Sequence, residues 1–206
     1  NKLSKLFDIS LEVARAGTVR EMLDRTMTGL RDLGLFGRMV LVIKDRQGRD
    51  EQFCHFGLSD DDLLMVRGTP PVPPGDIKGM LEREHRICNS YYLPYDRHRP
   101  QQLLTLTHPE GRPGSDWRPG DSLVIPLSAK GGTIGYLAAL DPADGRVPTV
   151  EAVRLLELYA NQAATAVVNL RLYTDLEASY YDTLLAFVAA MEAKDPYTKG
   201  HSENVQ

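Results

Sequence analysis

No proline or glycine occurs between Thr149 and Asp195, and this absence limits the fold of the chain more than any other feature. Alanine, leucine and glutamate, which are strong helix formers, dominate the segment. Thr149 has a side chain that suits the N-cap of a helix following it. We therefore predict one very long helix, roughly 70 Å at 1.5 Å per residue, a length that suits transmission or dimerisation.

Apolar residues recur along this segment at alternating steps of three and four, which is the heptad spacing of a coiled coil. The expected dimer seam consists of Leu170, Tyr173, Glu177, Tyr180, Leu184, Phe187 and Met191, with Glu177 as its polar position. We expect a homodimer in which two of these helices run parallel. Ala163, Ala166 and Leu170 also have a second interpretation, because a helix that leaves a domain buries one face on the sheet of that domain.

Charge, cysteine content and hydropathy exclude several classes of protein. The net charge of -4 and the pI near 5.7 do not provide the basic surface of a nucleic-acid-binding protein. Cys54 and Cys88 form no CxxC pattern, so we expect reduced thiols rather than a disulfide framework or a zinc site. The apolar runs are too short to cross a membrane, and residues 1–4 lack the apolar core of a signal peptide. We expect a cytoplasmic piece of a longer protein.

Before residue 149 the sequence alternates between helix signals and strand signals. A helix is predicted over residues 2–15. Thr18 and Glu21 then have the spacing of a capping box, which begins a second helix that Gly34 ends. The predicted apolar face of this second helix consists of Met22, Leu23, Met27, Leu30 and Leu33.

Two hairpins are predicted from strand and turn signals. Residues 39–43 are a continuous, largely β-branched run, and the turn at 45–48 returns the chain into residues 51–56. Residues 122–127 and 133–140 flank Lys-Gly-Gly at 130–132, which favours a second hairpin. The other predictions are a strand over 86–92, short helices over 59–67 and 76–84, a rigid loop over 69–75 and a long loop over 93–120.

Four segments, read in order, resemble the C-terminal half of GAF domains. They are Leu-Val-Ile-Pro-Leu at 123–127, the glycine turn at 131–132, Ile-Gly-Tyr-Leu at 134–137 and the helical run 155–173. The resemblance covers about residues 18–173. It implies an α+β fold of the GAF/PAS type, in which an antiparallel sheet has helices on one side and a ligand-capable pocket on the other. Gly135 is expected to let its strand pass close to a helix.

The last residues of the chain resemble the opening of an HD-GYP domain. The match runs from Leu184 to Val205 and includes Asp-Pro-Tyr-Thr-Lys-Gly-His-Ser at 195–202. In that family a histidine at the position of His201 belongs to a divalent metal site of iron or manganese type. A later His-Asp pair is essential there. The resemblance implies a parent protein that hydrolyses cyclic di-GMP, whereas this chain contains no His-Asp pair, so we expect neither catalysis nor a cofactor in it.

The two resemblances imply three parts of the chain. These are an N-terminal helix over 1–17, a GAF sensor domain over 18–172, and a coiled-coil linker with the truncated start of an HD-GYP domain over 173–206. Such a chain is expected to pass ligand or dimer state through its long helix to phosphodiesterase domains. The alternative is a GAF domain that binds no ligand and serves as a dimerisation scaffold.

Aromatic and polar residues gather where the GAF resemblance implies a pocket. Aromatic rings with a few convergent polar groups suit a small planar or anionic ligand. The candidate ligand-binding residues are Asp76, Tyr91, Tyr92, Tyr95, Asp96, His98 and Trp117. In a second interpretation the tyrosines cap the sheet edge and the charged residues are solvated. Cys54 and His55 are similar to a bilin attachment pair but lie on an early strand, so we expect no bilin there.

Overall fold

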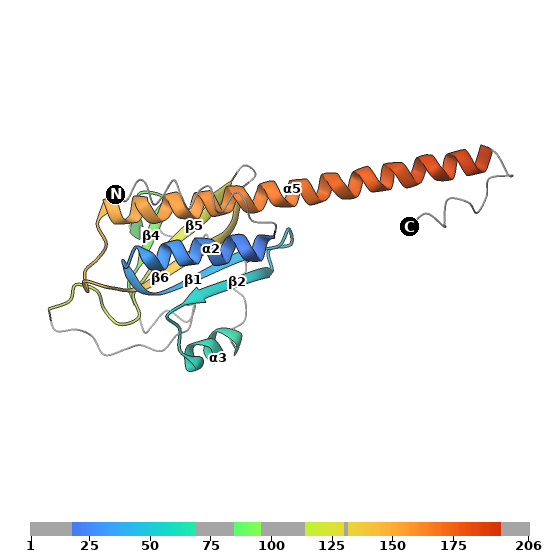
Figure 1. Ribbon diagram of the computed structural model, residues 1–206. Coiled ribbons are helices and arrows are strands. Elements are labelled where there is room, and N and C mark those ends of the chain that lie inside the picture. Colours follow the sequence, from blue (N-terminus) through green and yellow to red (C-terminus); the bar gives the residue numbers. More distant parts are fainter. Residues whose placement is uncertain (1–17, 69–84, 96–113, 130–131, 195–206) are drawn as a thin grey trace. The chain divides into compact units, whose positions relative to one another are not determined.

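The computed structural model describes residues 18–68, 85–95, 114–129 and 132–194 (Figure 1). They contain a six-stranded antiparallel sheet in the order β2-β1-β6-β5-β4-β3. The strands are β1 (Phe36–Lys44), β2 (Asp50–Phe56), β3 (Arg86–Ile87), β4 (Ser90–Leu93), β5 (Ser122–Ala129) and β6 (Gly132–Pro142). The helices are α2 (Val19–Asp32), α3 (Asp60–Gly68) and α5 (Val150–Lys194). The predicted α+β class, with its antiparallel sheet and long C-terminal helix, is confirmed.

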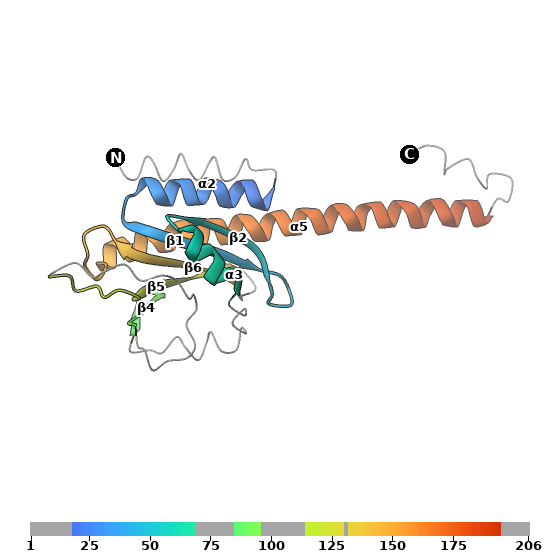
Figure 2. The same cartoon turned by 90° about the horizontal axis from the view of Figure 1, so that it is seen from below.

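Within residues 18–167, α2 and the beginning of α5 cover one face of the sheet and α3 lies on the opposite side (Figures 1 and 2). Side chains of β1 alternate between the two faces. Leu41 faces the helices, because its cross-strand partner Cys54 contacts Asp24 of α2. Arg38 faces the other side, where it reaches Asp62 of α3. Since β1 is buried on both faces, its sequence is a nearly continuous apolar run.

The main core lies between the sheet and the helices α2 and α5. Ile125 of β5 and Leu137 of β6 are register partners and are 1% and 0% exposed. From α5, the buried side chains include Leu156, Tyr159 and Ala163. A fully buried leucine contributes about 1.5–3 kcal/mol to the free energy of unfolding, so this layer supplies much of the stability of the domain.

Both ends of α2 follow the signals in its sequence. Thr18 is the N-cap, and its hydroxyl accepts a hydrogen bond from the Glu21 amide at 3.2 Å. At the other end Gly34 has a φ of 64°, and its amide donates to the Arg31 carbonyl at 2.9 Å. Glycine adopts this left-handed conformation without strain, which is why the helix ends there. The predicted start, end and apolar face of this helix are confirmed.

Both predicted hairpins are present. In the first, the Asp45 carboxylate accepts hydrogen bonds from the Gln47 and Arg49 amides, each at 2.8 Å, and so orders the turn between β1 and β2. The second joins β5 to β6, which are paired from Leu123 with Ala139 to Ala129 with Gly132. Residues 130–131 at its tip lie outside the described part. The predicted helix over 59–67 corresponds to α3, whereas the predicted helices over 2–15 and 76–84 fall on residues outside the described ranges.

Two sequence predictions are corrected. Residues 86–92 do not form one strand, because the chain turns at Cys88, which has a φ of 59°, and folds back as the antiparallel pair β3 and β4. Gly135 is needed for the approach of a strand rather than of a helix. A Cβ atom at Gly135 would lie 2.0 Å from the carbonyl oxygen of Val42 on the neighbouring strand β1. Glycine is therefore the residue that lets these two backbones pair so closely.

Helix α5 is a single helix of 45 residues, as its sequence predicts. The Thr149 hydroxyl accepts a hydrogen bond from the Ala152 amide at 3.3 Å at its start. The structure divides within this helix into two compact units, one ending at Val167 and the other beginning at Val168. Among the described helices, none combines the length and the hydropathy that a membrane span requires.

Candidate ligand face and its buried carboxylates

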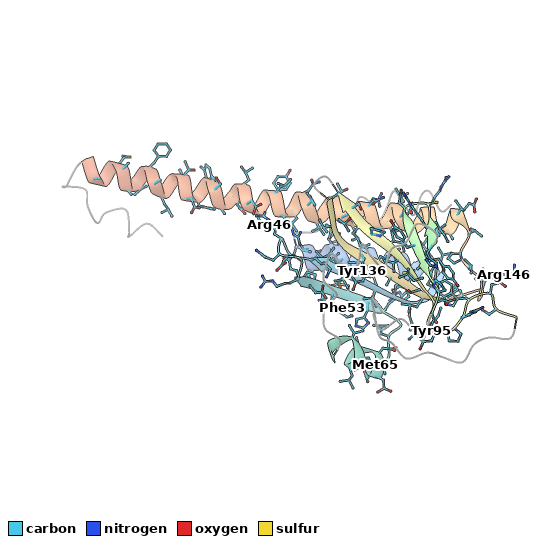
Figure 3. All side chains as sticks on the ribbon, turned by 180° about the vertical axis from the view of Figure 1, so that it is seen from behind. Arg46, Phe53, Met65, Tyr95, Tyr136 and Arg146 are labelled. Carbon is cyan, nitrogen blue, oxygen red and sulfur yellow. The ribbon has the colours of Figure 1, made fainter. Side chains whose placement is uncertain are left out.

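The sheet face opposite α2 and α5 is the candidate ligand face. Val42, Tyr136 and Ala138 lie on it, because Val42 and Tyr136 are register partners and residues two apart on a strand share a face. Phe53 of β2 pairs with Val42 and lies on the same side of the sheet as α3 (Figure 3). The face is therefore apolar at its centre and carries the phenol of Tyr136 there. Burial, together with the nearby charge of Asp50, raises the pKa of Tyr136 above its ordinary value, so the phenol is a neutral donor.

Lys44, at the end of β1, adds a cation at the border of this face. Its ammonium donates to the Asp50 carboxylate at 2.6 Å and lies 6.0 Å from the centre of the Tyr136 ring. The ammonium also reaches the Gly48 carbonyl at 3.4 Å. Groups of the β1–β2 hairpin thus compensate the charge of Lys44. We therefore assign Lys44 a structural role in this hairpin.

Arg38 connects three elements through one buried and one partly buried ion pair. Its guanidinium contacts the Asp62 carboxylate of α3 at 3.3 Å and the Asp141 carboxylate at the end of β6. The Asp62 side chain is 2% exposed. Asp62 also forms a reciprocal capping pair with Ser59, in which each residue's side chain accepts from the other's amide, at 3.0 and 3.1 Å. One carboxylate therefore begins α3 and attaches it to the sheet.

Asp121 organises the aromatic residues at one edge of the sheet. This carboxylate is fully buried and accepts hydrogen bonds from the Tyr92 hydroxyl at 2.6 Å and from the Tyr95 amide at 2.7 Å. The Arg118 amide also donates to it, at 2.8 Å. Burial and the adjacent carboxylate raise the pKa of Tyr92, which keeps its hydroxyl protonated as the donor. The ring of Tyr92 lies 5.5 Å from that of Trp117.

Trp117 contributes a donor to this aromatic cluster. The ring packs edge-on against Phe36 at 6.0 Å, and the residue is 5% exposed. Within the described part of the chain, its indole nitrogen has no hydrogen-bond partner. A buried donor without a partner costs about 1–3 kcal/mol, so a ligand acceptor placed here would recover that free energy.

The structure brings together three of the predicted ligand-binding residues. Tyr92 bonds to Asp121 through its hydroxyl and Tyr95 through its backbone amide, and the ring of Trp117 lies against that of Tyr92. Tyr91 points to the opposite face of β4 from Tyr92, which is the candidate ligand face, because Tyr91 pairs with Val124 and Val124 with Ala138. Four predicted residues lie outside the described ranges, namely Asp76, Asp96, His98 and the metal ligand His201.

A further carboxylate, Glu157, joins the edge of the sheet to α5. Its Oε1 atom accepts hydrogen bonds from the Asn89 amide and the Ser90 hydroxyl, both at 2.7 Å. Glu157 is 8% exposed and Ser90 is fully buried. The hairpin of β3 and β4 is thereby fastened to the long helix at one point, and Asp121 holds the same hairpin to β5.

Sequence reasoning did not identify Arg38, Asp121 or Glu157. Arg38 directly precedes the apolar run of β1, but a charged residue at that position is normally solvated, so the sequence does not mark its burial. Asp121 also directly precedes a strand, between Gly120 and Ser122. Glu157 carries no signal of its own, since its partners Asn89 and Ser90 are 68 and 67 residues away in sequence.

Two other features are structural. Burial raises the pKa of the Cys54 thiol to about 11, and the neighbouring Asp24 carboxylate adds to the rise, so the thiol is a poor nucleophile. His55 lies on the opposite face of β2 from Cys54 and packs against Phe53, with ring centres 5.5 Å apart. Among the described residues, no group of three or more histidine, cysteine or acidic side chains is placed to hold a metal ion.

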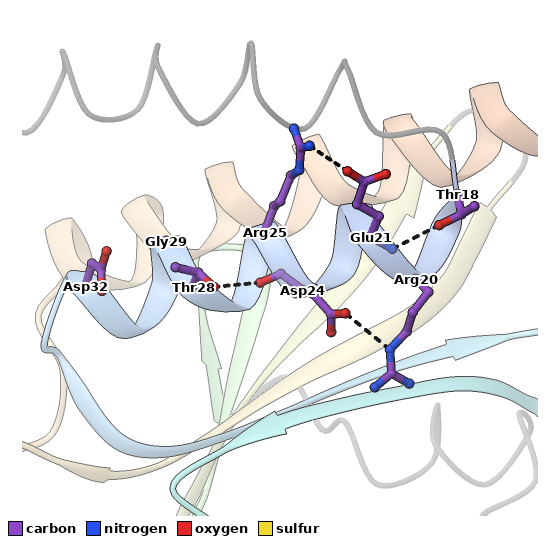
Figure 4. A pocket seen from close by; sticks show the side chains of 8 residues that line it. All are labelled: Thr18, Arg20, Glu21, Asp24, Arg25, Thr28, Gly29 and Asp32. Atoms are coloured by element: carbon purple, nitrogen blue, oxygen red, sulfur yellow. Dashed lines mark hydrogen bonds and ion pairs between the residues drawn. The ribbon is translucent and has the colours of Figure 1, made fainter.

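A hollow of about 480 Å³ lies along the outward face of α2 (Figure 4). Its charged residues pair with one another at a spacing of four, Arg20 with Asp24 at 3.3 Å and Arg25 with Glu21 at 2.6 Å. Pairs of this kind on an exposed helix surface contribute little free energy and are common without a ligand. The described residues that line the hollow are Thr18, Arg20, Glu21, Asp24, Arg25, Thr28, Gly29 and Asp32.

Several solved structures share this fold. A segment of a methyl-accepting chemotaxis protein is 20% identical, with a TM-score of 0.54, and the match covers 80% of this chain and 98% of that one. A cyanobacteriochrome GAF domain is 11% identical, with a TM-score of 0.51 and coverage of 78% and 95%. The GAF domain of an Acinetobacter phosphoenolpyruvate-protein phosphotransferase is 13% identical, with a TM-score of 0.50 and coverage of 81% and 92%.

At these identities the solved structures inform on the fold alone. No curated protein matches the chain significantly. The family model described as the GAF domain matches residues 18–167, which include the sheet, α2, α3 and the first part of α5.

Proposed function

The chain belongs to the GAF domain family, and on this premise we propose that it is the sensor module of a bacterial signalling protein. GAF domains are regulatory rather than catalytic. In this proposal a small molecule binds at the end of β4, beside Tyr92, Tyr95 and Trp117, on the side of the sheet where Ser90 of the same strand reaches α5. Its occupancy alters α5, which passes the change to an output domain.

The observation that carries this proposal is the pair of carboxylates that hold the β3–β4 hairpin. At the C-terminal end of β4, Asp121 accepts hydrogen bonds from the Tyr92 hydroxyl and the Tyr95 amide. At the N-terminal end of β4, Glu157 of α5 accepts hydrogen bonds from the Asn89 amide and the Ser90 hydroxyl. A ligand that moves this hairpin therefore acts on α5 through a buried, hydrogen-bonded contact. A switch needs such a contact, because the ligand has to bind two arrangements of the protein with different affinity.

The chemistry of the aromatic cluster favours a flat ligand with a hydrogen-bond acceptor. Tyr92 and Trp117 offer ring surfaces, and the indole nitrogen of Trp117 offers a donor that the described residues do not satisfy. Planar ligands stack well on such rings, and an acceptor atom would pair with the donor. We propose this cluster as the binding position in place of the full set of residues expected from sequence.

The output domain in this proposal is an HD-GYP phosphodiesterase acting on cyclic di-GMP. The support is the sequence match between Leu184 and Val205, with His201 at the position of a metal-binding histidine. One histidine does not hold a metal that needs four to six donors, so an iron or manganese site would require further residues of a complete domain. Two copies of α5 would pair through the predicted seam, and the module would act in the cytoplasm.

The proposal is tested by a thermal-shift screen with purines, cyclic dinucleotides, tetrapyrroles and amino-acid metabolites. We expect at least one class to raise the melting temperature of the chain. Trp117→Phe, which removes the donor and keeps an aromatic ring, should weaken that shift, whereas Asp144→Asn on the exposed turn after β6 should not. A shift that is equal in both variants would place the ligand elsewhere.

Transmission to α5 is tested with the same hit. Hydrogen exchange of residues 150–167 should change when the hit binds to the unaltered chain. In Glu157→Ala the thermal shift should persist while the exchange response of α5 decreases, because the oxygen that accepts from both hairpin donors is lost. An undiminished response in this variant would contradict the proposed route.

A second candidate function, a dimerisation scaffold without a ligand, is favoured by the burial of the candidate face. Val42, Tyr136 and Ala138 are 2%, 7% and 1% exposed. If the protein's own side chains fill this face permanently, no ligand reaches its centre. If none of the compounds changes the melting temperature and the chain still dimerises, the scaffold is favoured over the sensor.

A further inference from the structure

The part of α5 after Val167 presents a surface that is both apolar and acidic. Between Arg171 and Lys194 the sequence contains no lysine or arginine. The acidic residues in this stretch are Asp175, Glu177, Asp182 and Glu192. A coiled coil usually selects its partner through pairs of opposite charge beside the seam, and this segment lacks one of the two signs.

The apolar side chains of this segment are numerous enough to form an interface. Those that are 37–71% exposed are Leu172, Tyr173, Leu176, Tyr180, Tyr181, Leu184, Leu185, Phe187, Val188 and Met191. Four of them are aromatic, and an aromatic side chain buries about 150–250 Å². At their present exposure, the aromatic side chains of two copies would bury on the order of 1,000 Å², which is near the minimum of a specific interface.

A second copy of the chain is the occupant that fits the spacing of this surface. The 3.5-residue repeat from Leu170 to Met191 matches another helix of the same repeat, since an α-helix packing on a flat surface would follow 3.6 residues per turn. When two copies run parallel and in register, each seam residue meets its own counterpart. Glu177 is the one seam position that carries a charge.

We propose that Glu177 faces Glu177 of the second copy and holds the dimer at weak affinity, so that pairing strengthens when this repulsion is screened or removed. The proposal rests on the homodimer of the proposed function and adds the residue that sets the affinity of that dimer. Like charges at a close contact disfavour association, and the low dielectric of a partly buried seam increases the effect. With no basic residue along the stretch to compensate, added salt should tighten the dimer, whereas a dimer held by ion pairs is loosened by salt.

The test is sedimentation equilibrium of the 206-residue chain at 50 and 500 mM sodium chloride. For the unaltered chain we expect the dimer dissociation constant to fall about threefold at the higher salt concentration. Glu177→Gln should lower it about fivefold at 50 mM and flatten the salt dependence. The matched control is Asp182→Asn, which removes the same charge at an exposed position outside the seam and should change the constant less than about twofold.

The outcomes separate this inference from the proposed function. A dimer that salt weakens, or that Glu177→Gln and Asp182→Asn strengthen equally, would overturn the role of Glu177 while leaving the homodimer in place. A chain that remains monomeric under all of these conditions, with normal helical circular dichroism, would overturn both. Tightening confined to Glu177→Gln, with a flattened salt response, supports the parallel, in-register pair.

Discussion

The two parts of α5 have similar composition and opposite environments. Before residue 168, one apolar face of the helix, including Leu156, Tyr159 and Val167, is buried against the domain, and these three residues are at most 1% exposed. After that point Tyr173, Phe187 and Met191 are 64–71% exposed. The comparison shows that helix propensity sets the length of α5, whereas its neighbours decide which apolar residues stabilise the fold. In the second part, the apolar face remains available for association.

The strongest test of this difference is truncation of one leucine in each part. Leu156→Ala should lower the free energy of unfolding by about 2–5 kcal/mol, because it opens a cavity in the layer between helix and sheet. Leu172→Ala, at a position that is 59% exposed, should change it by less than about 0.5 kcal/mol. Urea unfolding followed by circular dichroism measures both. Equal losses would mean that the two parts are packed alike.

Charge placed on the predicted seam should affect association and leave folding intact. Leu184→Asp with Phe187→Asp should weaken the dimer at least about a hundredfold, because two carboxylates from each chain would have to be buried in the interface. Light scattering measures the mass, and the melting temperature of the domain serves as the control. A dimer mass that persists in this variant would contradict the seam.

Loss of Glu157 should loosen one edge of the sheet by an intermediate amount. In Glu157→Ala the Asn89 amide and the Ser90 hydroxyl lose their acceptor in a buried place, at a cost of about 1–3 kcal/mol. Amide exchange of residues 90–93 should accelerate. Glu177→Ala removes the same side chain from the exposed part of α5, and β4 in that variant should exchange as in the unaltered chain.

The smallest expected effect concerns the buried phenol of Tyr159. Its hydroxyl has no hydrogen-bond partner among the described residues, so Tyr159→Phe should stabilise the fold by about 1 kcal/mol or less. The exposed Tyr180→Phe is the matched control and should be neutral. A loss of stability in Tyr159→Phe would reveal a partner for the hydroxyl.

The same phenol gives a pH dependence. Burial, with a contribution from Asp32, raises the pKa of Tyr159 in the folded state. The folded state therefore binds this proton more tightly than the unfolded chain, and the resulting stability is complete below the unfolded pKa of about 10 and is lost as the pH rises beyond it. Tyr159→Phe should reduce this alkaline loss, which unfolding measurements between pH 8 and 11 would detect.

Local signals predicted the fold well. Thr18 and Thr149 cap the helices that their sequences indicate, and the segments on either side of the turn signals, β1 with β2 and β5 with β6, are paired strands. The failure at residues 86–92 has a physical cause. Cys88 adopts a left-handed conformation that non-glycine residues rarely take, so nothing in the sequence marks the turn.

The candidate site was less accessible to sequence reasoning. Tyr92, Tyr95 and Trp117 were identified from their residue types, but Asp121, which accepts hydrogen bonds from Tyr92 and Tyr95, was not. Contacts such as Arg38 with Asp141 join residues 103 positions apart, and only the tertiary fold brings them together. Charged residues of this kind are normally solvated, so their burial is visible in the structure alone.

The close approach at Gly135 has a consequence for how freely this chain tolerates change. Any side chain there would collide with the backbone of β1, and β1 and β6 are neighbouring interior strands of the sheet. Separation of β1 from β6 would disturb the packing on both faces of the sheet. A saturation library at this codon should therefore return glycine almost alone among folded variants, while the codons for exposed positions of α5 accept many replacements.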